Sequence, residues 1–162
     1  NLNYLLNLSH NYSIKTVLGI ETSCDDTAVG IVNTNREIVA ESKFNQWSIH
    51  KKLGFSKKNS TWTGGVWPEI AKKLHYEYLI HAVSDCIDSM KNGWNDIDAI
   101  ALTTKPGLEI CLWEGIHFTR QLLNNHKKPL IPIDHMEAHA LTSRLFDTNL
   151  EYPFLTLLIS GG

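Results

Sequence analysis

Three strand-like runs follow one another near the start of the chain, with only a short turn between each run and the next. They occupy residues 16–22, 27–32 and 38–44, and turn-forming residues occupy 23–26 and 33–36. Apolar and β-branched runs bounded by such turns are typical of strands joined as hairpins. The sequence therefore predicts a β-meander as the first unit of the fold.

The first turn of this meander carries Ser23, Cys24, Asp25 and Asp26. Hydroxyl and carboxylate groups placed in this way can hydrogen-bond phosphate or metal-bound water. The same residue types also form turns for purely local reasons. Both interpretations fit Ser23, Asp25 and Asp26.

Helix and strand patterns alternate after the meander. Pro68 suits the first position of a helix, and Glu69 suits the positive end of the helix dipole. Alternation of this kind indicates an α/β fold with strands leading into the candidate site loops. The expected elements are a loop at 47–65, a helix at 68–90, a strand at 97–104, a helix from 108, a strand at 129–133, a helix at 136–146 and a strand at 154–160.

Two histidines, His135 and His139, follow the strand expected at 129–133. At a spacing of four residues they lie on one helical face, so the two imidazoles can chelate one divalent cation. A pair at this spacing also occurs by chance on surface helices. A zincin-type peptidase is disfavoured, because there the Glu directly follows the first His. Here Met136 holds that place, and Glu137 lies about 100° further round the helix.

The composition fits a single globular domain and excludes few functions. The 162 residues are 43% hydrophobic and 20% charged, and the formal net charge is −2. With no global basic character, an RNA partner would need a local basic patch. The chain also contains no stretch of about eighteen apolar residues that would predict a membrane span. Two clusters are candidates for a basic patch or for an ordinary solvated face: Lys51, Lys52, Lys57 and Lys58, and Arg120, Lys127 and Lys128.

The three cysteines are far apart in the sequence and odd in number. They are Cys24, Cys86 and Cys111, and no CxxC motif is present. This argues against a disulfide framework and for a reducing compartment.

Five short motifs carry a resemblance to a known family. The chain is similar to the tRNA N6-adenosine threonylcarbamoyltransferases, once labelled O-sialoglycoprotein endopeptidases and grouped with M22-like peptidases. The mitochondrial branch is the most similar, through residues 103–108 and 127–133. In family order and spacing, the motifs are GIETSCDDT at 19–27, GGVWPE at 64–69, PGL at 106–108, HMEAH at 135–139 and SGG at 160–162.

This resemblance implies an actin/Hsp70/sugar-kinase-like (ribonuclease H-like) α/β domain. Residues 14–162 would then form an N-terminal actin-like ATPase-type domain that stops before the second half of the fold. Residues 1–13 contain neither an acidic residue nor an Arg, and are expected to be an N-terminal extension or the remnant of a targeting segment.

The resemblance also implies an activity. The family transfers the threonylcarbamoyl group from threonylcarbamoyl-adenylate to N6 of adenosine 37, in tRNAs that read codons beginning with A. The adenylate comes from a separate synthase. A homodimer, a mitochondrial location and no membrane association are expected.

Site residues follow from the same resemblance. His135 and His139 match two protein ligands of one divalent metal ion, for which Fe or Zn is expected. The third ligand, an aspartate in the family, would lie beyond Gly162. The segment that binds the adenylate matches Leu158, Ile159, Ser160, Gly161 and Gly162.

The chain departs from the family pattern at four places. After Ala71 the family commonly has Ser-Arg and then His, whereas this chain has Lys72, Lys73, Leu74 and His75. Asp134 replaces a His, and is expected either to cap the helix or to orient a ligand histidine. Lys105 replaces a Gly, and either places a cation near the ligand or faces solvent. The stretch between His50 and Gly64 is longer than usual.

Two alternative functions remain. An ATP-dependent small-molecule kinase of the same superfold would share the acidic turn and the glycine loops but has no need of the histidine pair. A non-catalytic fragment is the other alternative.

Overall fold

A computed structural model of the chain describes residues 13–53, 55–56, 61–62 and 64–159. The expected N-terminal extension lies almost entirely outside these residues. In chain order, the elements are β1 (Thr16–Glu21), β2 (Asp26–Asn33), β3 (Ile38–Asn45), α2 (Trp47–Leu53), β4 (Phe55–Ser56), β5 (Thr61–Trp62), α3 (Pro68–Asp88), the 3-10 helix η2 (Gly93–Asp96), β6 (Ala99–Lys105), α4 (Glu109–His126), β7 (Leu130–Asp134) and α5 (His135–Phe146).

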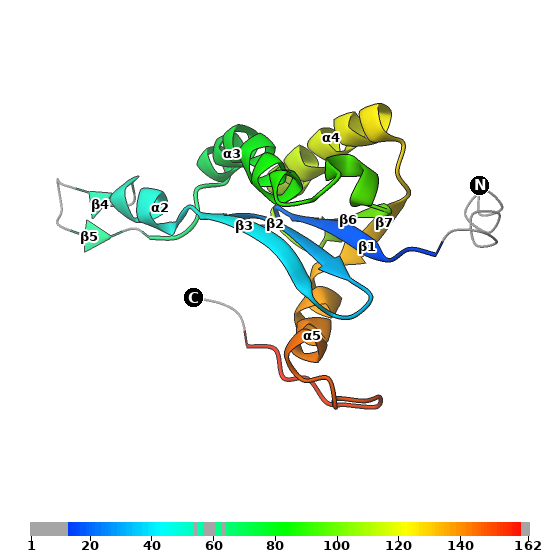
Figure 1. The fold of residues 1–162 in the computed structure, drawn as a ribbon. Helices are drawn as coiled ribbons and strands as arrows, with labels where there is room; N and C mark the ends of the chain where they lie inside the picture. Colours follow the sequence, from blue (N-terminus) through cyan, green and yellow to red (C-terminus); the bar gives the residue numbers. More distant parts are fainter. Residues whose placement is uncertain (1–12, 54, 57–60, 63, 160–162) are drawn as a thin grey trace, which may run out of the picture.

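A five-stranded mixed sheet forms the centre of the molecule, with the strand order β3-β2-β1-β6-β7 (Figure 1). Both meander pairs, β1 with β2 and β2 with β3, are antiparallel. The later strands pair in parallel, β1 with β6 and β6 with β7. This topology confirms the predicted β-meander followed by alternating helices and strands. It also brings the carboxyl ends of β1, β6 and β7 to one edge of the sheet.

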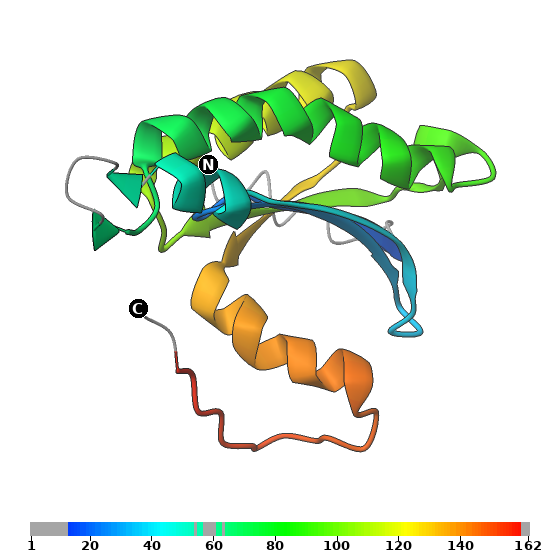
Figure 2. The same cartoon turned by 90° about the vertical axis from the view of Figure 1, so that its left-hand side faces the viewer.

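Helices α3 and α4 lie side by side on one face of the sheet (Figure 2). Alternate residues of each strand point to this face, as the period of two in a strand requires. Burial of these apolar side chains between sheet and helices supplies the main stabilising term. The core includes Leu18, Ile20, Val29, Ile31, Leu79, Val83, Ile97, Ile100 and Leu102.

Gly115 sets the distance between α4 and the end of β1. A Cβ atom at Gly115 would lie 2.5 Å from Thr22 Oγ1 and 3.3 Å from Leu102 Cδ1. The hydroxyl of Thr22 donates a hydrogen bond of 3.0 Å to the carbonyl of Cys111. The absence of a side chain at Gly115 thus allows α4 to approach closely enough to hold the start of the turn that follows β1.

Helix α5 lies on the opposite face of the sheet (Figure 2). Between them is a cavity of about 500 Å³. The sheet leaves room for this cavity because small residues line it. Gly19 pairs with Gly30 on β2 and with Ala101 on β6. Beyond the C-terminal end of α5, Arg36 Nη1 donates to the carbonyl of Thr148, 3.2 Å away. This bond connects the β2–β3 hairpin to the segment after α5.

Two expectations for the secondary structure were wrong. Residues 47–65 contain the helix α2 and the short hairpin β4–β5, not a loop alone. The helix begins there because Asn45 Oδ1 accepts the backbone N–H of Trp47 at 3.0 Å, and because His50 is buried. The strand expected at 154–160 is absent over its described residues, which are irregular.

The failed strand prediction has a simple physical cause. An apolar run forms a strand only where a neighbouring strand can satisfy its backbone hydrogen bonds. None of the described strands pairs with residues 153–159. Side chains there are exposed instead, with Leu155 at 102%, Leu157 at 83% and Ile159 at 88%.

All three cysteines are free thiols, with Cys24 exposed and Cys86 and Cys111 buried. This confirms that the chain has no disulfide framework. Among the described residues, no helix is long and apolar enough to cross a membrane.

Candidate functional site

The candidate site lies where β7 passes directly into α5. Asp134 is in an extended conformation, and its Oδ1 accepts the backbone N–H groups of Met136 at 3.0 Å and Glu137 at 3.2 Å. These bonds satisfy donors that the first helical turn leaves free. Asp134 therefore caps the helix, as one of the two expectations for it stated, and its cap places His135 at the sheet edge.

His135 and His139 face each other across one turn of α5. Their Nε2 atoms are 3.1 Å apart and their rings meet edge to face. A Zn–N bond is about 2.0–2.1 Å long, so one ion can reach two nitrogens at this separation. The expectation that the two imidazoles share a face is confirmed, whereas metal binding by them stays a prediction. Among the described residues, no group of three His, Cys, Asp or Glu side chains is arranged to hold a metal ion.

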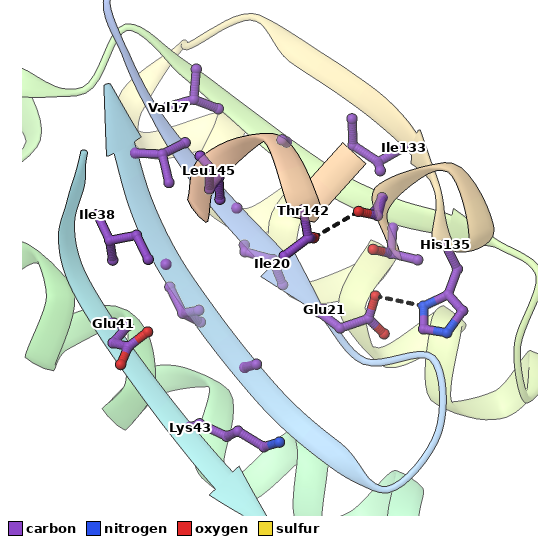
Figure 3. A pocket seen from close by; sticks show the side chains of 18 of the residues that line it. Val17, Ile20, Glu21, Ile38, Glu41, Lys43, Ile133, His135, Thr142 and Leu145 are labelled. Carbon is purple, nitrogen blue, oxygen red and sulfur yellow. Dashed lines mark hydrogen bonds and ion pairs between the residues drawn. The ribbon is translucent and has the colours of Figure 1, made fainter. Parts of the chain in front are cut away.

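Glu21, at the end of β1, and Ser23, in the turn after it, contact His135. Figure 3 shows the contact of Glu21 with His135. Glu21 Oε2 lies 3.1 Å from His135 Nδ1, and Ser23 Oγ lies 3.2 Å from the same nitrogen. A carboxylate can only accept, so the proton of a neutral His135 belongs on Nδ1. Its Nε2 lone pair is then directed at His139. Contacts of this kind orient histidines that bind metals.

Glu21 is held as a carboxylate. Burial raises the pKa of Glu21, but hydrogen bonds from Ser23, Thr103 and His135 together outweigh burial and bring the pKa below its usual value. One of the Ser23 bonds comes from its backbone N–H, which donates to Glu21 Oε1. A charged acceptor therefore faces His135 at neutral pH.

The turn that carries Ser23 is supported by the loop after β6. The backbone N–H of Leu108 donates to the Ser23 carbonyl at 2.7 Å. A Cβ atom at Gly107 would lie only 2.7 Å from that same carbonyl oxygen. Gly107 therefore allows two backbone segments to meet. Lys105, the last residue of β6, is exposed.

Asp26, also in the predicted first turn, contacts two residues of β3. Asp26 pairs with Lys43 Nζ at 2.6 Å and accepts from Asn45 Nδ2 at 2.7 Å. Burial, with a smaller effect of Asp25, raises the pKa of the Cys24 thiol to about 11. Cys24 is therefore a thiol at neutral pH and a poor nucleophile.

The structure describes only some of the other predicted site residues. Leu158 and Ile159 are exposed in the irregular segment beyond α5. Ser160, Gly161 and Gly162 lie outside the described residues. Glu137 is exposed on α5. In the two basic clusters, the side chains of Lys51, Lys52, Arg120 and Lys127 are exposed, that of Lys128 is half-buried, and Lys57 and Lys58 are not described.

The fold places the chain among α/β proteins of the actin-like and ribonuclease H-like class. YeaZ from Pseudomonas aeruginosa has a similar fold, with a TM-score of 0.54 over 83% of this chain and 50% of that one. The two sequences are only 16% identical, so this likeness concerns the fold alone.

Sequence comparison defines the family. The profile of TsaD, described as tRNA N6-adenosine threonylcarbamoyltransferase, matches residues 38–162. The human mitochondrial tRNA N6-adenosine threonylcarbamoyltransferase is 45% identical over 148 residues, which are 91% of this chain and 33% of the human protein. The enzyme of that name from Ehrlichia chaffeensis is 46% identical over 149 residues, 92% of this chain and 39% of that protein. The chain belongs to the TsaD family and spans about a third of the length of the curated relatives it matches.

Proposed function

We propose that the protein transfers a threonylcarbamoyl group from threonylcarbamoyl-adenylate to N6 of adenosine 37 in tRNAs that read codons beginning with A. Family membership over residues 38–162 supports this activity. The observation that carries it to a site is the pair of Nε2 atoms, 3.1 Å apart, on His135 and His139. A kinase of the same superfold would not need this pair, and the family match does not favour one.

The chemistry requires an activated carbonyl held next to a weak nucleophile. The exocyclic amine of adenosine is weak because its lone pair is delocalised into the ring, and the mixed anhydride of the adenylate supplies the leaving group. Positioning the two reactants together lowers the barrier. A divalent ion, Zn or Fe, would polarise or orient the carbonyl compound when bound. His135 and His139 are the residues of this chain that would hold it.

The residues around the histidines prepare them for that role. Glu21 keeps the proton of His135 on Nδ1, and Ser23 contacts the same nitrogen. The Asp134 cap fixes the first turn of the helix that carries both rings. Contacts from Glu21 and Ser23 thus direct Nε2 of His135 toward His139.

The test is a threonylcarbamoyl-transfer assay with the full-length protein, unmodified tRNA and supplied threonylcarbamoyl-adenylate. The double variant His135→Ala/His139→Ala should lose both bound metal and transfer. The matched control is His81→Ala/His117→Ala, which removes two exposed histidines from α3 and α4. Transfer that persists in the first variant without metal would show that the pair is structural. A metal-loaded wild type that transfers nothing would overturn the proposed activity.

We also propose a mitochondrial location and a homodimer. The location rests on relatives from mouse, rat and human that are named as mitochondrial enzymes. A fluorescent fusion of the full-length protein should co-localise with a mitochondrial dye, and a cytosolic signal alone would contradict the location. The homodimer follows from the family resemblance. Light scattering coupled to gel filtration should give twice the monomer mass.

A further inference from the structure

A line of buried polar side chains runs beneath the turn that carries Ser23. It consists of His50 on α2, Gln46 just before that helix, Thr27 on β2 and His75 on α3, each at most 1% exposed. Groups this deeply buried are stable only when they are hydrogen-bonded. Their partners therefore determine how each proton is placed.

The first half of this line begins at the backbone of Trp67. Its N–H donates to His50 Nδ1 at 3.3 Å, so the proton of a neutral His50 must be on Nε2. That Nε2–H donates to Gln46 Oε1 at 3.2 Å. The amide nitrogen of Gln46 then donates onward to Thr27 Oγ1 at 3.3 Å.

The second half ends at the backbone of Cys24. His75 Nε2 is 3.0 Å from the Cys24 carbonyl, which can only accept, so this nitrogen carries the proton. His75 Nδ1 is then an acceptor, and the Thr27 hydroxyl donates to it at 2.8 Å. All five hydrogen bonds therefore point the same way, from Trp67 to Cys24. Such chains strengthen their members cooperatively.

The common direction of these hydrogen bonds requires the imidazoles of His50 and His75 to be neutral. Burial lowers the pKa of His75 and of His50, in agreement with this requirement. This series of hydrogen bonds ends at Cys24, next to Ser23, whose hydroxyl contacts His135 Nδ1. Its other end is Trp67, in the GGVWPE motif before α3.

We propose that Gln46, Thr27 and His75 are positioning residues, which hold the Cys24 carbonyl and thereby set the orientation of His135 through Ser23. The same series of hydrogen bonds also couples the segment at Trp67 to the pair His135 and His139. Loss of the Thr27 hydroxyl leaves His75 Nδ1 with only the longer contact to Gln46 Nε2, at 3.4 Å, so the turn is held less firmly. The consequence for metal binding rests on the proposed function, because it assumes that His135 is a ligand.

The test uses three variants of the full-length protein. Thr27→Val removes the hydroxyl in the middle of the chain, Thr27→Ser keeps it, and Ile31→Val removes a buried methyl group from the same strand without touching the chain. Nitrogen NMR of the histidine rings in metal-free protein reports tautomers and ring environments, and titration with Zn²⁺ reports affinity. If Thr27→Val does not fold, Gln46→Met replaces it.

In the wild type, His50 and His75 should be protonated on Nε2 and His135 on Nδ1. Thr27→Val should shift the ring resonances of His135 and weaken Zn²⁺ binding by about tenfold, the low end of the loss for an outer partner of a ligand. The other two variants should match the wild type in both respects. Unchanged His135 resonances and unchanged affinity in folded Thr27→Val would overturn the proposal.

Failure of the proposed function is separable from failure of this proposal. A wild type that binds no Zn²⁺ would refute the metal site. The resonances of His135 in the metal-free variants would still decide whether the hydrogen-bonded chain positions that ring.

Discussion

Replacing Glu21 with Gln should weaken metal binding by the histidine pair about three- to tenfold. The amide keeps the shape of the side chain and can still accept from His135 Nδ1, but its charge is gone. Hydrogen bonds to charged groups contribute about 1.5–3 kcal/mol, against about 0.5–1.5 kcal/mol between neutral groups. The difference of about 1 kcal/mol corresponds to about fivefold in affinity. The side chains of His135 and Glu21 are 26% and 30% exposed, so solvent screening keeps the loss from being larger.

The assay is isothermal titration of metal-free protein with Zn²⁺, and the control is Glu137→Gln. This variant removes the same charge from an exposed position on α5, where the structure shows no side-chain hydrogen bond or ion pair of Glu137 with another described residue. Glu137→Gln should bind Zn²⁺ as the wild type does. Equal affinities of all three proteins, or an equal loss in both variants, would refute the role of Glu21.

Four further predictions concern stability, each measured by urea denaturation. Thr119→Val should raise the free energy of unfolding by up to about 1 kcal/mol, because the buried Thr119 hydroxyl has no hydrogen-bond partner among the described residues. Thr22→Val should lower the free energy of unfolding by losing the bond to α4. A loss of stability in Thr119→Val would show that its hydroxyl is satisfied after all. Gly107→Ala should cost about 1–3 kcal/mol, since the new Cβ would press on the Ser23 backbone. Unfolded His75 takes up a proton near pH 6.5, but burial lowers its pKa in the folded protein, so its contribution is complete above about pH 6.5 and declines below it. His75→Gln should therefore lose stability less steeply between pH 7 and pH 5, and an identical slope would contradict this.

The elements that could be predicted from sequence are those with a local periodicity. The meander follows from apolar runs and turn residues, and the histidine pair follows from a spacing of four residues on a helix. In both cases the physical cause acts over a few neighbouring residues. The structure confirms the predicted arrangement of His135 and His139 for that reason.

The surroundings of the pair could not be predicted in the same way. Glu21 lies 114 residues before His135 in the sequence, and parallel pairing of β1, β6 and β7 brings the two together. One signal could have predicted their proximity. The strands expected before Ser23 and before His135 each end just before polar residues, and parallel strands end at the same edge of a sheet. Helix α2 was missed because seven residues are too few to show a period, and its start depends on the side chain of Asn45.

The shallow burial of α5 has a consequence for the local opening of the site. None of its residues is buried, whereas α3 and α4 each bury several. Segments with little buried surface open at a small fraction of the global unfolding free energy, and their amide protons exchange early. The two histidines therefore lie on a helix that opens more easily than α3 or α4. An ion that binds only the closed helix would stabilise it by mass action, so the amides of α5 should exchange more slowly as the ion concentration rises.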